Sequence, residues 1–296
     1  MNRIRHLYDF QSHYLDLEGQ QYHYLDEGQG EPVVMVHGNP SWSFMYRKLI
    51  SSLRQTSRVI VPDHMGCGLS DKPDHSTYSY TLERRTADLE RLLDQLGVTS
   101  NITLIVHDWG GPIGMRFATR FPDRIARLIV FNSTAFLLPE SKPLHWSLQF
   151  CRNSRLAAFL ILKFNAFARV STYLGCQSQR MPREIRRAYA GPYDSSQNRI
   201  ATLAFVQDIP LSPIDPSYAP LKEVQEKLTL FQQTPMLICW GEADFVFDRD
   251  FLAEWIRHFP QARVRRFPEA GHYVLEEVPE VILPLVSEFM EQHRQV

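Results

Sequence analysis

Short, continuous apolar segments alternate along much of this chain with longer segments that have the apolar spacing of helices. Five of these segments are rich in Val, Ile and Leu: PVVMV (32–36), RVIVP (58–62), ITLIV (102–106), ARLIVF (126–131) and MLICW (236–240). A strand that is apolar on both of its sides needs cover on both faces, as in a parallel sheet between two layers of helices. The alternation therefore predicts an α/β fold with a mostly parallel central sheet flanked by helices.

The remaining segments complete the predicted layout. Further strands are expected at 13–18, 21–26 and 262–267, and helices at 42–54, 82–96, 111–121, 249–258 and 275–292. Residues 135–215 interrupt the alternation, because they carry helical segments and no clear strand. We therefore predict a core domain of residues 1–134 and 216–296 and an inserted helical cap domain of residues 135–215. Such a cap would cover the carboxyl ends of the strands, where open α/β sheets bind ligands.

One apolar stretch of the cap, LAAFLILKFNAFA (156–168), has two interpretations. It is too short to span a bilayer. It is either a cap helix that faces the core or a lid that faces lipid or lines the substrate site.

Composition limits the classes of partner. The chain has 296 residues and a formal net charge of −1, so no basic excess favours nucleic acid. No apolar run is long enough for a transmembrane helix, and the N-terminus has no apolar segment typical of a secretory signal. Four cysteines lie far apart without CxxC spacing, which favours the reducing cytoplasm and no zinc site. We expect neither a metal nor a cofactor.

The segment LIVHDWGGP (104–112) places Asp108 between a buried strand and a helix. This strand–turn–helix pattern is typical of a nucleophile elbow, in which the nucleophile projects from the top of the sheet. Val106 is bulkier than the small residue usual there, and Asp108 could also be a helix N-cap. The chain has no G-x-S-x-G segment, which argues against a serine esterase.

Two further segments supply partners for Asp108. GEADFVF (241–247) follows a predicted strand and contains Asp244, and AGHYVLEE (270–277) contains His272. Taken singly, these are ordinary turn and loop residues, but their order is that of an α/β-hydrolase triad: nucleophile, acid, histidine. A carboxylate can displace a leaving group at a saturated carbon and form an ester. His272 would then activate water to hydrolyse that ester, while Asp244 orients the imidazole.

The leaving group and the oxyanion need hydrogen-bond donors. HGNPSWSF (37–44) follows a strand and contains Asn39, and Trp109 adjoins the nucleophile. Their backbone N–H groups can hold an oxyanion, and the Asn39 amide and Trp109 indole can hold a departing anion. The alternative for Asn39 is a turn residue before proline.

Together, HGNPSWSF, PDHMGCGLSDKP (62–73), HDWGGP, GEADFVFD and GHYVLEE resemble the haloalkane dehalogenases of the α/β-hydrolase fold over nearly the whole chain. The resemblance implies Asp108 as nucleophile, His272 as base, Asp244 as acid, and Asn39 with Trp109 as the halide-binding pair. One subfamily places a Glu after the strand at 126–131. Here that segment reads FNSTAFLLP, and Asn132 is no acid, so Asp244 remains and the pattern resembles the third subfamily.

The segments AGPYDSSQNRIATLAFVQDIPL (190–211) and DHMGCGLSDKP also resemble the β-lactone decarboxylases of olefin biosynthesis. Those enzymes convert a cis-β-lactone with two alkyl chains into an alkene and carbon dioxide. The sequence thus predicts an enzyme for a hydrophobic small molecule, with halide displacement as the first hypothesis. Decarboxylation, with a carboxylate leaving group, is the alternative. A homo-oligomer or a biosynthetic assembly is compatible with the second resemblance.

Three weaker alternatives remain. An epoxide hydrolase needs cap tyrosines, and four are available: Tyr173, Tyr189, Tyr193 and Tyr218. A ligand receptor without catalysis would use the same fold. The segment GCGLSD (66–71) has some features of a phosphate loop but lacks its third glycine.

Overall fold

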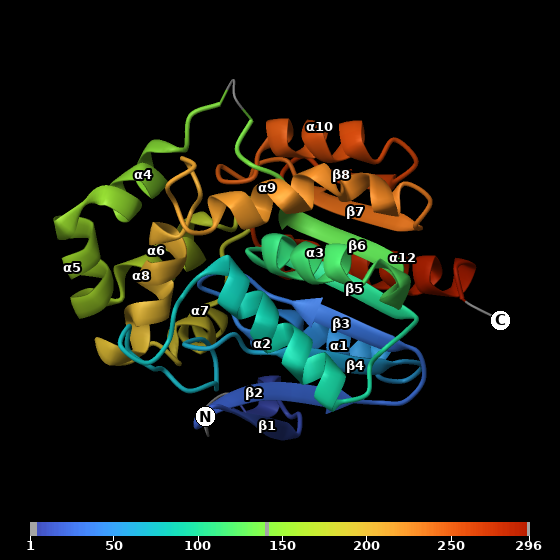
Figure 1. The fold of residues 1–296 in the computed structure, drawn as a ribbon, viewed down its shortest axis with the longest axis horizontal. Coiled ribbons are helices and arrows are strands. Elements are labelled where there is room, and N and C mark those ends of the chain that lie inside the picture. The colour runs from blue at the N-terminus through green and yellow to red at the C-terminus, as the bar shows by residue number, and fades with distance from the viewer. Residues whose placement is uncertain (1–4, 140–141, 295–296) are drawn as a thin grey trace.

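The computed structural model describes residues 5–139 and 142–294 (Figure 1). Its centre is an eight-stranded sheet of the described chain with the order β1-β2-β4-β3-β5-β6-β7-β8. The strands are β1 (Ser12–Leu17), β2 (Gln20–Glu27), β3 (Pro32–Val36), β4 (Arg58–Pro62), β5 (Ile102–Asp108), β6 (Ile125–Ser133), β7 (Met236–Gly241) and β8 (Arg263–Phe267). β1 pairs antiparallel with β2, and β2 pairs antiparallel with β4, whereas all other neighbours are parallel. The predicted fold class is confirmed.

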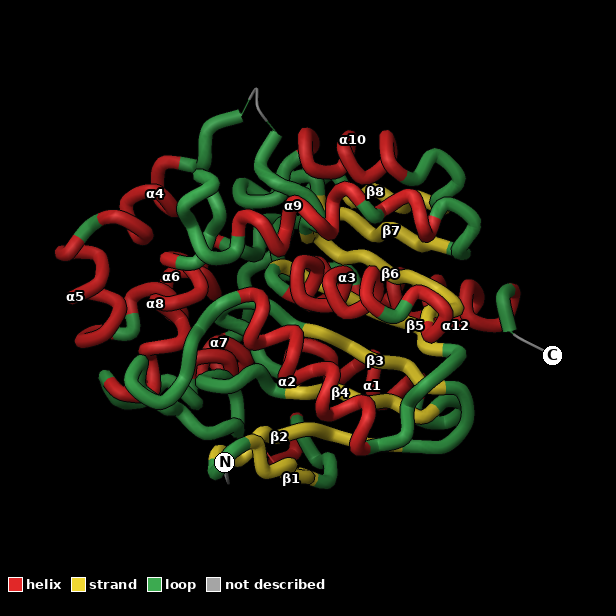
Figure 2. Tube along the Cα trace, in the orientation of Figure 1, coloured by secondary structure: helices red, strands yellow, loops and turns green. Residues whose placement is uncertain are grey.

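Helices cover both faces of this sheet (Figure 2). The helices of one face are α2 (Leu82–Gln95), α3 (Gly110–Arg120), α9 (Tyr218–Glu226) and α10 (Arg249–His258). Those of the other face are α1 (Arg47–Leu53) and α12 (Pro279–Gln292). Alternate residues of one strand serve the two faces, since Val34 and Val36 pack in the first cluster and Val33 and Met35 in the second. Continuous apolar strands are the consequence of this two-sided burial.

Some predicted helices are divided. Residues 42–54 form a 3₁₀ turn, η2 (Ser43–Tyr46), before α1, and residues 275–292 form α11 (Val274–Glu277) and α12, which begins at Pro279. Proline at the first position of a helix has no N–H to lose and is favoured there. The other 3₁₀ turns are η1 (Arg5–Leu7), η3 (Pro122–Arg124), η4 (Gln197–Arg199) and η5 (Leu228–Phe231).

Between β6 and β7 the described residues include six α-helices and no strand. They are α4 (Trp146–Asn153), α5 (Arg155–Phe164), α6 (Ala166–Leu174), α7 (Arg183–Ala190), α8 (Ile200–Gln207) and α9. Figure 1 shows α4 to α8 gathered at one end of the sheet, while α9 lies over its face. Across the described ranges, no helix combines the length and apolar character needed to cross a bilayer.

The apolar stretch 156–168 is not one helix. Asn165 has a left-handed backbone (φ 55°) and separates α5 from α6. Ala157 and Ile161 are buried, whereas Leu156, Phe159 and Phe164 are exposed. A helix that simply faces the core, the first interpretation, therefore does not describe this segment.

Candidate active site

Asp108 ends β5 and occupies a sharp turn with a left-handed backbone (φ 51°). Trp109, not Asp108, is the N-cap residue of α3, so capping does not explain the aspartate. The Oδ1 atom of Asp108 accepts a hydrogen bond from the backbone N–H of Asn39 at 2.6 Å. Gly38 makes this close approach available, because a Cβ at that position would overlap the Asp108 side chain. The local backbone thus presents a nearly buried carboxylate at the carboxyl end of the sheet.

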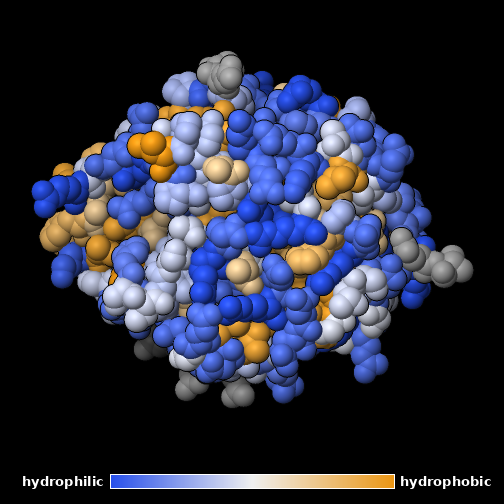
Figure 3. All heavy atoms as spheres, in the orientation of Figure 1, coloured by the Kyte–Doolittle hydropathy of each residue, from blue (hydrophilic) through white to orange (hydrophobic). Residues whose placement is uncertain are grey.

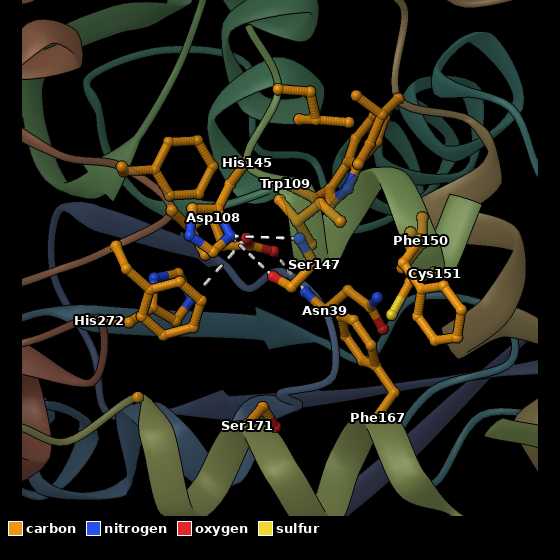
Figure 4. A pocket seen from close by; sticks show the side chains of 18 of the residues that line it. Asn39, Asp108, Trp109, His145, Ser147, Phe150, Cys151, Phe167, Ser171 and His272 are labelled. Atoms are coloured by element: carbon orange, nitrogen blue, oxygen red, sulfur yellow. Dashed lines mark hydrogen bonds and ion pairs between the residues drawn. The ribbon is translucent and has the colours of Figure 1, made fainter. Parts of the chain in front are cut away.

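His272 lies beside this carboxylate (Figure 4), and Asp244 lies on the other side of the imidazole. The Nδ1 atom of His272 is 2.8 Å from Oδ2 of Asp244, and its Nε2 atom is 3.8 Å from Oδ2 of Asp108. Burial alone would lower the pKa of His272, but the charges of Asp244 and Asp108 raise it above the ordinary value. The structure therefore brings all three residues of the predicted triad together.

Burial also perturbs Asp108. It raises the pKa of this carboxyl, while His272 and the backbone N–H groups of Asn39 and Trp109 act in the opposite direction. From the sequence we expected the helix N-terminus to favour the ionised form. The donors are present, but burial is the larger effect.

Asn132 is a site residue that sequence reasoning noted only for not being an acid. Its Nδ2 donates to Oδ2 of Asp244 at 3.0 Å and to the carbonyl of Gly241 at 2.9 Å. Its Oδ1 accepts from the backbone N–H of Gly241 at 2.8 Å. Asn132 is fully buried at the end of β6, so it fixes both the acid and the strand end that carries it. Its place after an apolar strand was the available signal.

Three other buried hydrogen bonds fix the loops around the site. The Nε2–H of His107 donates to the carbonyl of His272 at 2.9 Å. The backbone N–H of His64 donates to Nε2 of His37 at 3.0 Å, and Nδ1–H of His37 donates to the carbonyl of Gly38 at 2.8 Å. The imidazole of His37 thereby holds the loop that carries Asn39.

The segment 66–71 packs against a buried carboxylate rather than an anion site. Both oxygens of Asp63 accept backbone N–H groups, from Ser43 at 2.7 Å and from Leu69 at 2.8 Å. A Cβ at Gly68 would overlap this same side chain. Negative charge in this position disfavours a phosphate, which speaks against the nucleotide-binding alternative.

Asn39 and Trp109 face the same cavity as Asp108 and His272. One N–H of the Asn39 amide donates to the backbone carbonyl of Thr202 in α8 at 3.0 Å, which leaves the second N–H for a ligand. The Trp109 indole N–H has no acceptor within the described residues, and its ring packs against Phe205 at a centroid distance of 5.5 Å. Two neutral donors therefore remain beside the carboxylate.

The cavity has a volume of about 350 Å³. Its floor is Asp108 with Asn39, Trp109 and His272, and its walls are mainly apolar side chains of α4, α5 and α6. These apolar side chains include Leu148, Phe150, Leu160, Ile161, Phe167, Val170 and Leu174. An apolar chamber over one carboxylate suits a hydrophobic small molecule.

None of the four tyrosines considered for an epoxide hydrolase lines this cavity. Tyr189 donates to Oε1 of Glu276 at 2.8 Å, and Tyr193 donates to the carbonyl of Ser41 at 3.3 Å. Tyr173 is more than half exposed. A cap tyrosine that protonates an epoxide oxygen is therefore not found in the described part of the chain.

Comparison with known proteins adds independent findings. A family profile described as alpha/beta hydrolase fold matches residues 31–279. A cis-3-alkyl-4-alkyloxetan-2-one decarboxylase of Shewanella oneidensis is 52% identical over 97% of this chain and 90% of its own length. One from Xanthomonas campestris is 47% identical over 97% and 98%.

Haloalkane dehalogenases are also similar. One from Mycolicibacterium paratuberculosis is 32% identical over 91% of this chain and 89% of its own length. The crystal structure of one from Agrobacterium tumefaciens has a TM-score of 0.85 at 24% identity, covering 96% of this chain and 97% of the other. These relatives confirm the resemblance predicted from the motifs, and their identities favour the decarboxylase alternative over halide displacement.

Proposed function

This chain belongs to the α/β hydrolase fold family, and on that premise we propose that it is a decarboxylase of cis-3-alkyl-4-alkyloxetan-2-ones. These are β-lactones with two alkyl chains, and the products would be an alkene and carbon dioxide. The observation that carries the proposal is the Asp108 carboxylate on the floor of an apolar cavity, with free donors of Asn39 and Trp109 beside it.

The proposed reaction has two steps. First, an Oδ atom of Asp108 attacks C4, the ring carbon that bears the ring oxygen. The C4–O bond breaks, its electron pair stays on that oxygen, and an alkyl ester and a free substrate carboxylate result. Then the bond from C3 to the carboxylate carbon breaks, and its electron pair forms the C3=C4 double bond. Carbon dioxide leaves, and Asp108 departs with the electrons of its C–O bond.

In each step, polar residues lie where negative charge develops and would stabilise it. The Asn39 amide and the Trp109 indole would hold the carboxylate oxygen that forms in the first step. Backbone N–H groups of Asn39 and Trp109, together with His272, would stabilise Asp108 when it becomes a carboxylate again. Asp244, which is fixed by Asn132, would orient His272.

This route consumes neither water nor a proton. Hydrolysis of the ester would give a β-hydroxy acid instead of an alkene, so exclusion of water would decide the product. The apolar walls of the cavity support that requirement.

The proposal is tested by following alkene protons with NMR after a long-chain cis-β-lactone is mixed with the purified chain. We expect alkene formation by the wild type and its loss in Asp108→Asn. Absence of alkene from a folded wild-type chain, or full activity of the variant, would refute the proposal.

Halide displacement remains the second candidate, because the same donors can hold a halide and dehalogenases are among the relatives. That reaction needs water, activated by His272, to hydrolyse the alkyl ester and release the Asp108 carboxylate. With a bromoalkane, His272→Ala should therefore accumulate an alkyl adduct detectable by intact mass. With the β-lactone, the ester fragments without water, so the same variant should accumulate none.

We further propose that residues 135–215 form the cap domain over a core of residues 1–134 and 216–296, and that the enzyme acts in the cytoplasm. Limited proteolysis within the cap, with and without substrate, would test the division. A cleavage pattern that ignores these boundaries would contradict it.

A further inference from the structure

The helices that line the cavity also carry an exposed apolar surface. Eight large side chains of α4, α5 and α6 are each at least 43% exposed: Trp146, Phe150, Leu156, Phe159, Phe164, Val170, Tyr173 and Leu174. We call these residues the cap patch. Figure 3 shows hydrophobic side chains on the end of the molecule where these helices lie. Clusters of this kind on a protein surface usually mark an interaction site.

Positive charge surrounds the cap patch. Residues 142–190 contain nine Lys or Arg residues and one acidic residue, Glu184, a formal charge of +8 in a chain whose net charge is −1. Six of these cations are exposed and form no ion pair with a residue of 5–139 or 142–294: Arg155, Lys163, Arg169, Arg180, Arg183 and Arg187. Glu184 itself pairs with His6 at 3.1 Å.

Charge and apolar surface are contiguous. Arg155 and Lys163 flank the exposed residues of α5, and Arg169 precedes Val170 in α6. From α7, the guanidinium of Arg186 lies 4.0 Å from the ring centroid of Tyr173. Aromatic and aliphatic side chains mixed with Lys and Arg are the composition of helices that lie in a membrane interface.

The cap patch and the wall of the cavity have three residues in common. Phe150, Val170 and Leu174 line the cavity, yet each is 43% or more exposed. These three side chains therefore belong both to the wall of the cavity around Asp108 and to the exposed surface.

We propose that the cap patch docks on a lipid bilayer that carries negative charge, so that the cavity opens toward the lipid. The unpaired cations favour anionic lipid headgroups. They disfavour a second copy of the chain, because two faces of the same charge repel each other. The use of this surface rests on the proposed function, since a substrate with two alkyl chains and an alkene product both partition into lipid.

Vesicle flotation tests the proposal. Vesicles of phosphatidylglycerol and phosphatidylcholine should bind the wild-type chain, and vesicles of phosphatidylcholine alone should bind it far more weakly. Each basic residue near an anionic surface strengthens binding by about fivefold, so the triple variant Arg155→Gln, Lys163→Gln, Arg169→Gln should bind on the order of 100-fold more weakly.

A second variant tests the apolar component. Leu156→Ser, Phe159→Ser, Phe164→Ser removes three exposed side chains of α5 that do not line the cavity. It should also lose binding, while the matched controls Leu230→Ser and Arg265→Gln, exposed and outside the cap, should bind as the wild type does. Circular dichroism checks that every variant is folded.

Three results would overturn the proposal. They are no binding by the wild type, equal binding to neutral vesicles, and unchanged binding of both triple variants. If the wild type fails to bind vesicles and instead forms a dimer in size-exclusion chromatography that the serine variant abolishes, a second copy is the occupant of the cap patch.

Failure of the proposed function would look different. Asp108→Asn should float with vesicles as the wild type does. The cap variants should keep their activity on detergent-dispersed β-lactone and lose it on β-lactone embedded in vesicles. Vesicle binding without any alkene would refute the decarboxylase and leave the docking surface intact.

Discussion

Asn132→Ala probes how strongly the end of β6 determines the site. The substitution removes two hydrogen bonds with Gly241 and one with the Asp244 carboxylate, all fully buried. A neutral bond contributes about 1 kcal/mol and one to a charged group about 2 kcal/mol, so the free energy of unfolding should fall by about 4 kcal/mol. For a chain of 296 residues that lowers Tm by about 6 °C.

Activity should fall as well, for a geometric reason. Without Asn132, the Asp244 carboxylate loses the donor that fixes its position opposite His272. Misplacement of a catalytic group by about 1 Å can cost about 100-fold in rate. Since Asn132 does not line the cavity, kcat should decrease by about that factor while KM changes little.

Thermal unfolding and alkene formation at saturating β-lactone measure these two effects. Thr86→Ala is the control, because its buried hydroxyl donates to the carbonyl of Leu82 within α2, away from the site. It should lose about 1 kcal/mol and no activity. Wild-type kcat in a folded Asn132→Ala chain would refute the positioning role of Asn132.

Three further predictions follow from the site. Gly38→Ala should abolish turnover, because the new Cβ would overlap Asp108; activity within twofold of wild type would contradict this. Trp109→Phe removes the indole N–H and should lower kcat on both β-lactone and bromoalkane by about 10–1,000-fold, and an effect on neither substrate would exclude the indole as a donor. Asp244→Asn should lower the pKa of His272, because the charge that raises it is removed; NMR titration measures this, and an unchanged pKa would disprove the coupling. Because the folded state raises the pKa of His272, protonation of His272 stabilises the fold fully below the ordinary value of about 6.5. That stabilisation is lost as the pH rises through the raised pKa. In Asp244→Asn the free energy of unfolding should therefore decrease less over that pH range.

Much of the fold follows from local pattern. β3 to β7 coincide closely with the continuous apolar segments, because burial on both faces leaves no polar position in their centres. The position of Asp108 at the end of a strand was predictable for a related reason. A charged residue that follows a continuous apolar strand and precedes two glycines and a helix has few structural roles. The break at Asn165 was not predicted, since a single left-handed residue leaves no trace in apolar periodicity.

The contacts within the site were harder to predict from the sequence than the residues that form it. Thr202 accepts from Asn39 across 163 positions of sequence through a backbone carbonyl, which any residue type supplies. Asn132 meets Asp244 across 112 positions, and only the pairing of β6 with β7 brings them together. Long-range contacts of this kind depend on topology, and local spacing does not encode them.

The central claim is that an ester on Asp108 fragments to an alkene without water. It is tested most directly by turnover of a cis-3,4-dialkyl β-lactone in water enriched in oxygen-18, followed by mass spectrometry of the peptide that contains Asp108. Hydrolysis of an ester would place heavy oxygen in the carboxylate, whereas fragmentation returns the original oxygens. We predict alkene with an unlabelled Asp108 from the β-lactone. Heavy oxygen accumulating in Asp108 during β-lactone turnover would contradict the account.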